Sequence, residues 1–190
     1  MQAVLICGSR NLKGQTVRAA EAVVKGLAEA GCRTRSFFLP PMKIERCRQC
    51  DDAGWGICRT EGRCVIEDDF ASLAEAIRAS DAVVLASPVY FGDLCESLRA
   101  FLDRLRRTCV RAEGKQGIGG KPALGVCVAG GGGGGSASCA LSLEKVLLTC
   151  GFDLMEVVPV RRQNLQAKLV ALSEAGKTLA GWSTARPAQT

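Results

Sequence analysis

Histidine does not occur in this chain of 190 residues. Its absence excludes the Ser-His and Cys-His pairs of nucleophilic catalysis, and it excludes every zinc site that needs an imidazole ligand. A metal site in this chain must therefore be built from cysteine and carboxylate ligands. Aromatic residues are also scarce, at 5% of the chain, so two adjacent aromatic residues, Tyr90 and Phe91, stand out.

Long apolar runs are absent as well, and none is long enough to span a bilayer. The first residues lack the basic start and apolar core of a signal peptide. We therefore expect a cytoplasmic protein with no membrane partner. The net charge of +6 is dispersed and is not interleaved with aromatic residues, so we expect no nucleic acid partner either. We interpret one local group of arginines as a solvated helix face: Arg99, Arg104, Arg106, Arg107 and Arg111.

Cysteine, in contrast, is abundant, with eleven residues. In a reducing compartment this number favours metal, cluster or redox chemistry over disulfides. Four cysteines share one irregular segment, residues 42–69, in the pattern Cys47-x2-Cys50-x7-Cys58-x5-Cys64. Thiolates suit zinc or an iron–sulfur cluster, and the residues alone leave a cluster, zinc and free thiols all open. We expect the other seven cysteines to be small core residues.

Apolar runs alternate with amphipathic segments along the rest of the chain. The runs predict strands at residues 3–7, 33–39, 82–86, 122–129 and 153–160, separated by helices. This alternation predicts an α/β fold, namely a doubly wound parallel sheet of five strands in the order 2-1-3-4-5, in a three-layer sandwich. We expect a single domain over residues 1–184, with a cysteine-rich insertion at 42–69 and a tail at 185–190.

Three loops follow the first, third and fourth predicted strands. They meet at the edge of the sheet where the strands have their carboxyl ends, which we call the crest. They are residues 8–16, residues 87–92 and the six-glycine run 130–135. The first suits a phosphate group at a helix start, and the second presents two aromatic rings. Glycine in the third lets backbone approach a ligand. We expect a substitution at Gly92 to disturb the site, and we expect Gly135→Ala to be mild.

These residues resemble a known family. Gly8-Ser9 with Thr16, and Ser87-Pro88-Val89-Tyr90-Phe91-Gly92, resemble the flavodoxin-like NAD(P)H-dependent FMN reductase family. The resemblance runs from Ala3 to about Val160. It implies an FMN cofactor, with either Arg10 or Asn11 near its phosphate. The binding residues that it implies are Ser9, Arg10, Asn11, Gln15, Thr16, Pro88, Val89, Tyr90, Phe91, Gly92, Gly130, Gly131 and Gly132.

The cysteine segment and the stretch from Cys64 to Phe70 resemble the iron–sulfur flavoprotein branch of that family. This resemblance implies a [4Fe-4S] cluster held by Cys47, Cys50, Cys58 and Cys64, although the spacing between Cys50 and Cys58 carries five residues more than the branch's compact motif.

The implied function is an FMN-dependent oxidoreductase that passes electrons from NAD(P)H or a ferredoxin-like donor to a small-molecule or protein acceptor. The implied assembly is a homodimer or homotetramer. Two alternatives remain open. One is a cluster-free NAD(P)H-dependent FMN or quinone reductase, and the other is a non-enzymatic electron-transfer or thiol-rich metal-binding protein.

Overall fold

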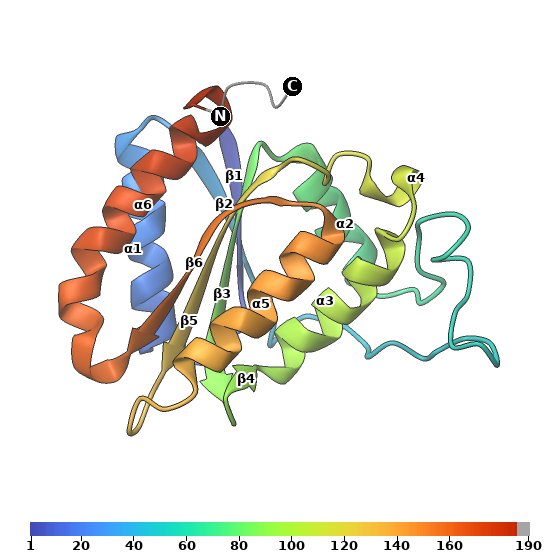
Figure 1. The fold of residues 1–190 in the computed structure, drawn as a ribbon, viewed down its shortest axis with the longest axis horizontal. Coiled ribbons are helices and arrows are strands. Elements are labelled where there is room, and N and C mark those ends of the chain that lie inside the picture. The colour runs from blue at the N-terminus through green and yellow to red at the C-terminus, as the bar shows by residue number, and fades with distance from the viewer. Residues whose placement is uncertain (186–190) are drawn as a thin grey trace.

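The sheet is the centre of the molecule, which is described here by a computed structural model over residues 1–185 (Figure 1). Its five long strands are parallel and lie in the order β2 (Arg33–Phe38), β1 (Gln2–Cys7), β3 (Ala82–Tyr90), β5 (Pro122–Ala129) and β6 (Asp153–Arg161). This is the predicted order of long strands. The predicted number of strands was wrong by one, because the two-residue β4 (Asp93–Leu94) pairs antiparallel with the end of β3.

Helices cover both faces of the sheet and complete the predicted three layers. The helices α1 (Gln15–Glu29) and α6 (Leu165–Ala185) lie on one face. The other face carries α2 (Phe70–Ala79), α3 (Glu96–Thr108) and α5 (Ser136–Cys150), while α4 (Ala112–Lys115) and the 3-10 turn η1 (Arg162–Asn164) are short connections. Among the described helices, none has an apolar stretch that could cross a membrane. The predicted tail begins at Ala185, where α6 ends, and its remaining residues, 186–190, lie outside the described residues.

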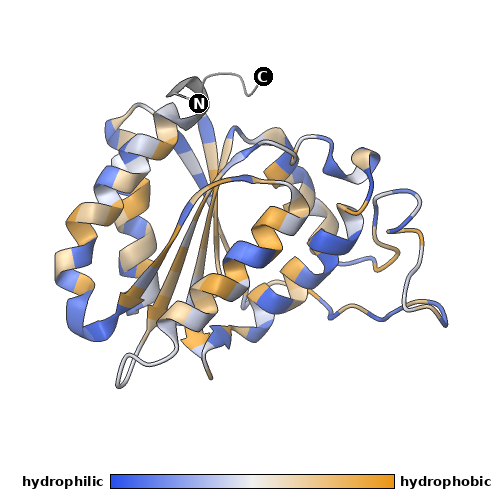
Figure 2. Ribbon diagram, viewed as in Figure 1, coloured by the Kyte–Doolittle hydropathy of each residue, from blue (hydrophilic) through white to orange (hydrophobic). Residues whose placement is uncertain are grey.

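The strands are buried on both faces, as their unbroken apolar runs predict. Side chains alternate along β1, so that Val4 and Ile6 pack under α2, α3 and α5 while Leu5 and Cys7 pack under α1 and α6. Figure 2 shows the resulting hydrophobic band through the central strands. The seven cysteines expected in the core are all buried, which confirms that prediction: Cys7, Cys32, Cys95, Cys109, Cys127, Cys139 and Cys150.

The predicted loop at residues 87–92 is largely strand. Ser87 to Tyr90 continue β3, and the chain reverses only at Phe91 and Gly92 before β4. The hairpin is closed by the Ser87 hydroxyl, which accepts the backbone N–H of Cys95 at 3.1 Å. Because Pro88 lacks an N–H group, its position suggested a loop, whereas in the structure it pairs with Val128 at the end of the strand.

The cysteine segment, residues 42–69, contains no helix or strand. Figure 1 shows it leaving the carboxyl edge of the sheet and running beside α3 and α4, on the side of the molecule opposite to α1 and α6. The cysteine segment therefore lies on the flank of the domain, whereas the glycine-rich loop at residues 130–135 lies on the crest of the sheet.

Candidate functional site

A cavity of about 700 Å³ opens at the carboxyl ends of β1, β3 and β5. This volume is within the range of cofactor pockets. The first loop contributes Ser9, Asn11, Gln15 and Thr16, the second contributes Pro88, Val89 and Tyr90, and the third contributes Gly130 and Gly131. These nine predicted residues are brought together. The other four, Arg10, Phe91, Gly92 and Gly132, do not line this cavity.

The first loop is organised by its own hydrogen bonds. The Ser9 hydroxyl donates to the Asn11 carbonyl at 3.1 Å, and the backbone N–H of Gly14 donates to the same carbonyl at 2.9 Å. The Asn11 side-chain oxygen accepts the N–H of Lys13 at 3.0 Å. Asn11 therefore forms the turn that leads into α1 and lines the cavity, whereas Arg10 lies in a neighbouring surface pocket with Phe91 and Glu96.

Helix α1 begins at this loop without a cap. Gly14 is the N-cap residue, no side chain bonds to the first turn, and no acidic residue lies in that turn. The first N–H groups of such a helix remain free to bind a ligand, and the helix dipole favours an anion there. Gln15 and Thr16 place this end of the helix on the cavity wall. The arrangement therefore fits a phosphate group.

Three basic side chains on the cavity wall were missed from the sequence, namely Lys13, Arg18 and Arg162. None of them forms an ion pair with another described residue. Lys13 and Arg18 flank residues that were predicted, so a wider window around the first loop could have found them. Arg162 comes from the 3-10 turn after β6, and only the sheet order brings it here.

The second and third loops contact each other across the crest. A Cβ atom on Gly135 would lie 2.5 Å from the Gly92 Cα, and both glycines have a φ of 76°. The Ser138 hydroxyl donates to the Gly92 carbonyl at 2.8 Å and holds the two turns together. The expectation that Gly135→Ala is mild was therefore wrong, because that position has neither the backbone conformation nor the space for a side chain.

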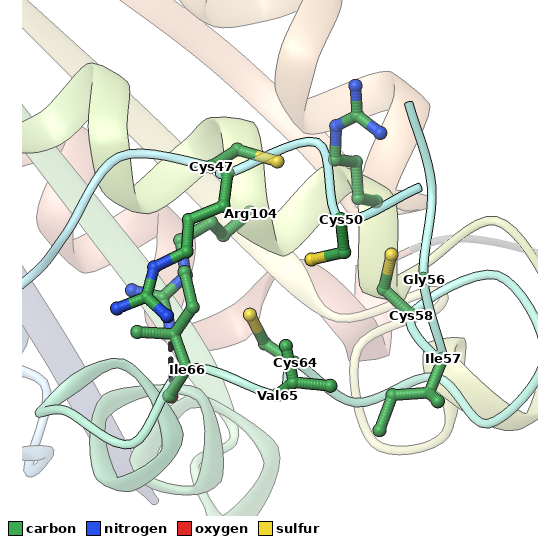
Figure 3. Close-up of a pocket in the computed structure, with 11 residues that line it drawn as sticks. Cys47, Cys50, Gly56, Ile57, Cys58, Cys64, Val65, Ile66 and Arg104 are labelled. Carbon is green, nitrogen blue, oxygen red and sulfur yellow. Dashed lines mark hydrogen bonds between the residues drawn. The ribbon is translucent and has the colours of Figure 1, made fainter. Parts of the chain in front are cut away.

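The four cysteines of the irregular segment form a second site. Cys47, Cys50, Cys58 and Cys64 line one small cavity (Figure 3). The rest of its wall is formed by three arginines and four other residues: Arg48, Arg104, Arg107, Gly56, Ile57, Val65 and Ile66. Figure 3 shows the sulfur atoms of Cys50, Cys58 and Cys64 turned toward one shared space, with the sulfur of Cys47 above them. The structure thus places the four predicted thiols around one cavity.

The thiol cavity is narrow. Its volume is about 20 Å³, which is room for one water molecule. Among the described residues, no three Cys, Asp or Glu side chains lie close enough to hold one metal ion. A tetrahedral zinc–thiolate site needs sulfur atoms about 3.8 Å apart, from Zn–S bonds of about 2.3 Å. The four thiols therefore share a cavity without forming a compact single-ion site.

Arg104 on α3 anchors both ends of this segment. Its side chain is only 1% exposed, and it forms an ion pair with Asp68, which is 4% exposed. The two terminal nitrogens of Arg104 donate to the two Asp68 oxygens at 2.6 and 2.9 Å, and they also donate to the carbonyls of Glu45 and Ile66. The prediction that Arg104 belongs to a solvated face was wrong, because this arginine packs over the Phe70 ring and ties the segment to the domain.

Arg107, one turn further along α3, holds the middle of the segment. It donates to the Gly54 carbonyl at 2.6 Å and lies 4.7 Å from the centre of the Trp55 ring. Arg59 lies 5.4 Å from the same ring. The seven residues between Cys50 and Cys58, five more than in the compact motif, are therefore tied to α3 through Gly54 and Trp55.

The electrostatics of the thiol cavity follow from this arrangement. Burial raises the pKa of the Cys58 thiol, and the neighbouring Arg107 charge opposes that shift. Burial alone would lower the pKa of Arg104, but its interactions with Asp68 and the Cys64 thiol raise it above its ordinary value. Each arginine therefore interacts with a different thiol of the cavity.

The two cavities share no residue. The cysteine segment does not fold over the crest of its own chain, because α3 and the Arg104–Asp68 pair hold it on the flank of the domain. Any approach of the thiol cavity to a crest cavity would have to involve a second chain.

Known proteins show two kinds of similarity to this chain. An iron-sulfur flavoprotein of Archaeoglobus fulgidus is 30% identical over 176 residues, which cover 93% of this chain and 84% of the relative. An iron-sulfur flavoprotein of Methanocaldococcus jannaschii is 29% identical over 131 residues, or 69% of this chain and 65% of the relative. Over this relative and two others, the match spans only 46–65% of their length.

The fold has close counterparts among solved structures. The structure of RosB with bound 8-demethyl-8-formylriboflavin-5'-phosphate matches with a TM-score of 0.76 at 18% identity, covering all of this chain and 82% of that chain. A flavodoxin from the domain Archaea matches with a TM-score of 0.61 at 14% identity, covering 97% of this chain and 99% of that chain, which confirms the flavodoxin-like fold. The profile of the family described as NADPH-dependent FMN reductase matches residues 1–163. The chain therefore belongs to the NADPH-dependent FMN reductase family and, within it, to the iron–sulfur flavoprotein branch.

Proposed function

We propose that this protein is an FMN-dependent oxidoreductase that carries a [4Fe-4S] cluster on Cys47, Cys50, Cys58 and Cys64. It would pass electrons from a reduced donor, either NAD(P)H or a ferredoxin-like protein, to a small-molecule or protein acceptor. The observation that carries the flavin assignment is the crest cavity, where an uncapped helix start, an aromatic side chain and a glycine loop surround one space.

The crest residues fit FMN by their chemistry. Ser9, Thr16 and the start of α1 offer hydroxyl and N–H donors to a phosphate, and Arg18 adds positive charge. Val89 and Tyr90 offer backbone and side-chain surface to a flat ring. Gly130 and Gly131 have open space where a Cβ would be, so backbone can approach a ligand closely.

The thiol cavity fits a cluster by its donor set, since four thiols from one segment surround it. A [4Fe-4S] cube separates its ligand sulfurs more widely than a single zinc ion does, so the absence of a compact single-ion site among the described residues does not conflict with it. Because the cavity is narrow, seating the cluster requires the segment to move outward. Such a movement breaks no helix or strand within residues 42–69, but it works against the contacts that Arg104 and Arg107 make with the segment.

When bound, FMN would supply two-electron or one-electron chemistry and the cluster one-electron chemistry. The chain's own residues bind and orient these groups. The crest loops would hold the phosphate and the ring, while the four cysteines would hold the cluster beside Arg104 and Arg107 of α3. With no histidine in the chain, acid–base catalysis by imidazole plays no part.

The proposal includes self-association into a homodimer or homotetramer. Leu12, Tyr90 and Phe91 are exposed hydrophobic side chains on the loops around the crest cavity. Their burial by a second chain would remove apolar surface from water. The native mass of the purified protein tests this part of the proposal.

The experiment that tests the flavin assignment compares FMN with riboflavin in equilibrium titrations of the flavin-free protein. Charge-assisted hydrogen bonds contribute about 1.5–3 kcal/mol each, so FMN should bind at least about tenfold more tightly. Arg18→Gln should reduce this preference, and Lys25→Gln, further along α1, should not. Equal affinities for FMN and riboflavin in the parent would overturn the assignment of the phosphate to the first loop.

A further inference from the structure

Two buried hydrogen-bond donors lie unused in the wall of the thiol cavity. Among the described residues, only three buried side-chain polar atoms lack a hydrogen-bond partner, and two of them are the Nε atoms of Arg104 and Arg107. Both arginines line the thiol cavity. A buried N–H group without a partner is unfavourable, so two such groups in residues that line one cavity point to an acceptor inside that cavity.

The remaining nitrogens of these arginines are already engaged. In Arg104 both terminal nitrogens bind Asp68 and backbone carbonyls. In Arg107 one terminal nitrogen binds the Gly54 carbonyl, and the guanidinium lies against Trp55. These contacts fix the orientation of each guanidinium. They leave the Nε–H groups as donors without a partner on two residues of α3 that line the thiol cavity.

We infer that the Nε–H groups of Arg104 and Arg107 donate hydrogen bonds to sulfur atoms held in the thiol cavity, either thiolates or cluster sulfides, and thereby raise the reduction potential of the cluster. This inference rests on the proposed cluster. Hydrogen bonds to the sulfurs and nearby positive charge stabilise the reduced form, which carries one more negative charge. The cluster potential is thus set by α3 as well as by the four cysteines.

The test is a redox titration of the anaerobically purified protein, followed by electron paramagnetic resonance of the reduced cluster. Arg107→Lys keeps the positive charge and removes the Nε–H donor. At a fixed ambient potential we expect about a tenfold lower ratio of reduced to oxidised cluster, which for a one-electron couple is a shift of about 59 mV to lower potential. Arg104→Lys should shift in the same direction.

Arg106→Lys is the matched control, because Arg106 lies on the same helix, pairs with Asp103 and does not line the cavity. Its titration should coincide with that of the parent. Parental potentials in both Arg104→Lys and Arg107→Lys would overturn the inference, as would loss of iron from both variants at an unchanged melting temperature. An iron-free parent that binds FMN would overturn the inference and the cluster, but would leave a cluster-free flavin reductase.

Discussion

The crest cavity and the thiol cavity are built in opposite ways. The crest cavity is formed by short turns at the ends of long parallel strands, so the sheet fixes its walls. The thiol cavity is formed by a segment without helix or strand, and contacts with α3 fix its position. The comparison shows that one domain can position two sites by different means, backbone pairing at the first and buried arginine side chains at the second.

The largest loss of stability is expected at the Arg104–Asp68 pair, which anchors the cysteine segment to α3. Asp68→Ala leaves Arg104 buried without its carboxylate, and breaking one partner of a buried pair costs about 3–5 kcal/mol. Urea denaturation measures the loss. Asp103→Ala, which removes a half-exposed pair with Arg106, is the control and should cost less than about 1 kcal/mol. Similar losses in the two variants would contradict the anchoring role of Arg104.

The contribution of Asp68 to the stability of the folded state should also depend on pH. Burial alone would raise the pKa of its carboxyl group, but hydrogen bonds from Arg104 and two backbone N–H groups hold that pKa below its ordinary value. A lowered pKa in the folded state stabilises the fold above the pKa of the unfolded chain, and the stabilisation is lost as the pH falls through the folded-state value. The stability difference between the parent and Asp68→Ala should therefore be full at neutral pH and shrink in acid. A difference that grew on acidification would contradict this sign.

The sequence predicted the crest better than the flank for a physical reason. Strand periodicity and the turn residues that follow each strand determine the crest, so nine of its residues could be named in advance. Arg162 could not be named in advance, because it lies in the turn after β6, and only the order of the strands in the sheet brings that turn to the cavity. On the flank, the cysteine spacing indicated which four thiols line one cavity, but Arg104 looked like any other helix arginine. Its burial depends on Asp68, which lies 36 residues earlier in the chain.

At the crest the expected loss of stability is smaller, and it arises at the contact between the turns at Gly92 and Gly135. Gly135→Ala forces a Cβ against Gly92 at a φ of 76°, and strain of this kind costs about 1–3 kcal/mol. Gly132→Ala is the matched control, since a Cβ there meets no atom within 4 Å. Thermal unfolding and FMN affinity should both change for Gly135→Ala and stay parental for Gly132→Ala. Equal unfolding temperatures and equal FMN affinities in the two variants would show that the turns at Gly92 and Gly135 do not contact each other.

The smallest effect is expected at Trp55. Its ring lies against Arg107 and Arg59, and exposed cation–π contacts contribute about 0.5–1 kcal/mol. Trp55→Leu should therefore barely change global stability, but it should speed cleavage of residues 51–58 by a protease, because the loop is held to α3 mainly through this side chain and the Gly54 carbonyl. Unchanged cleavage would show that other contacts hold the loop.

The most direct test of the central claim, that the two sites are separate, is the content of iron, sulfide and FMN per chain after anaerobic purification of the parent and Cys50→Ala. Cys50 lines only the thiol cavity. We predict that the parent contains iron, sulfide and FMN, and that Cys50→Ala loses the iron and sulfide while it keeps FMN in the parental amount. A parent without iron, or a variant that loses FMN together with iron, would contradict the account.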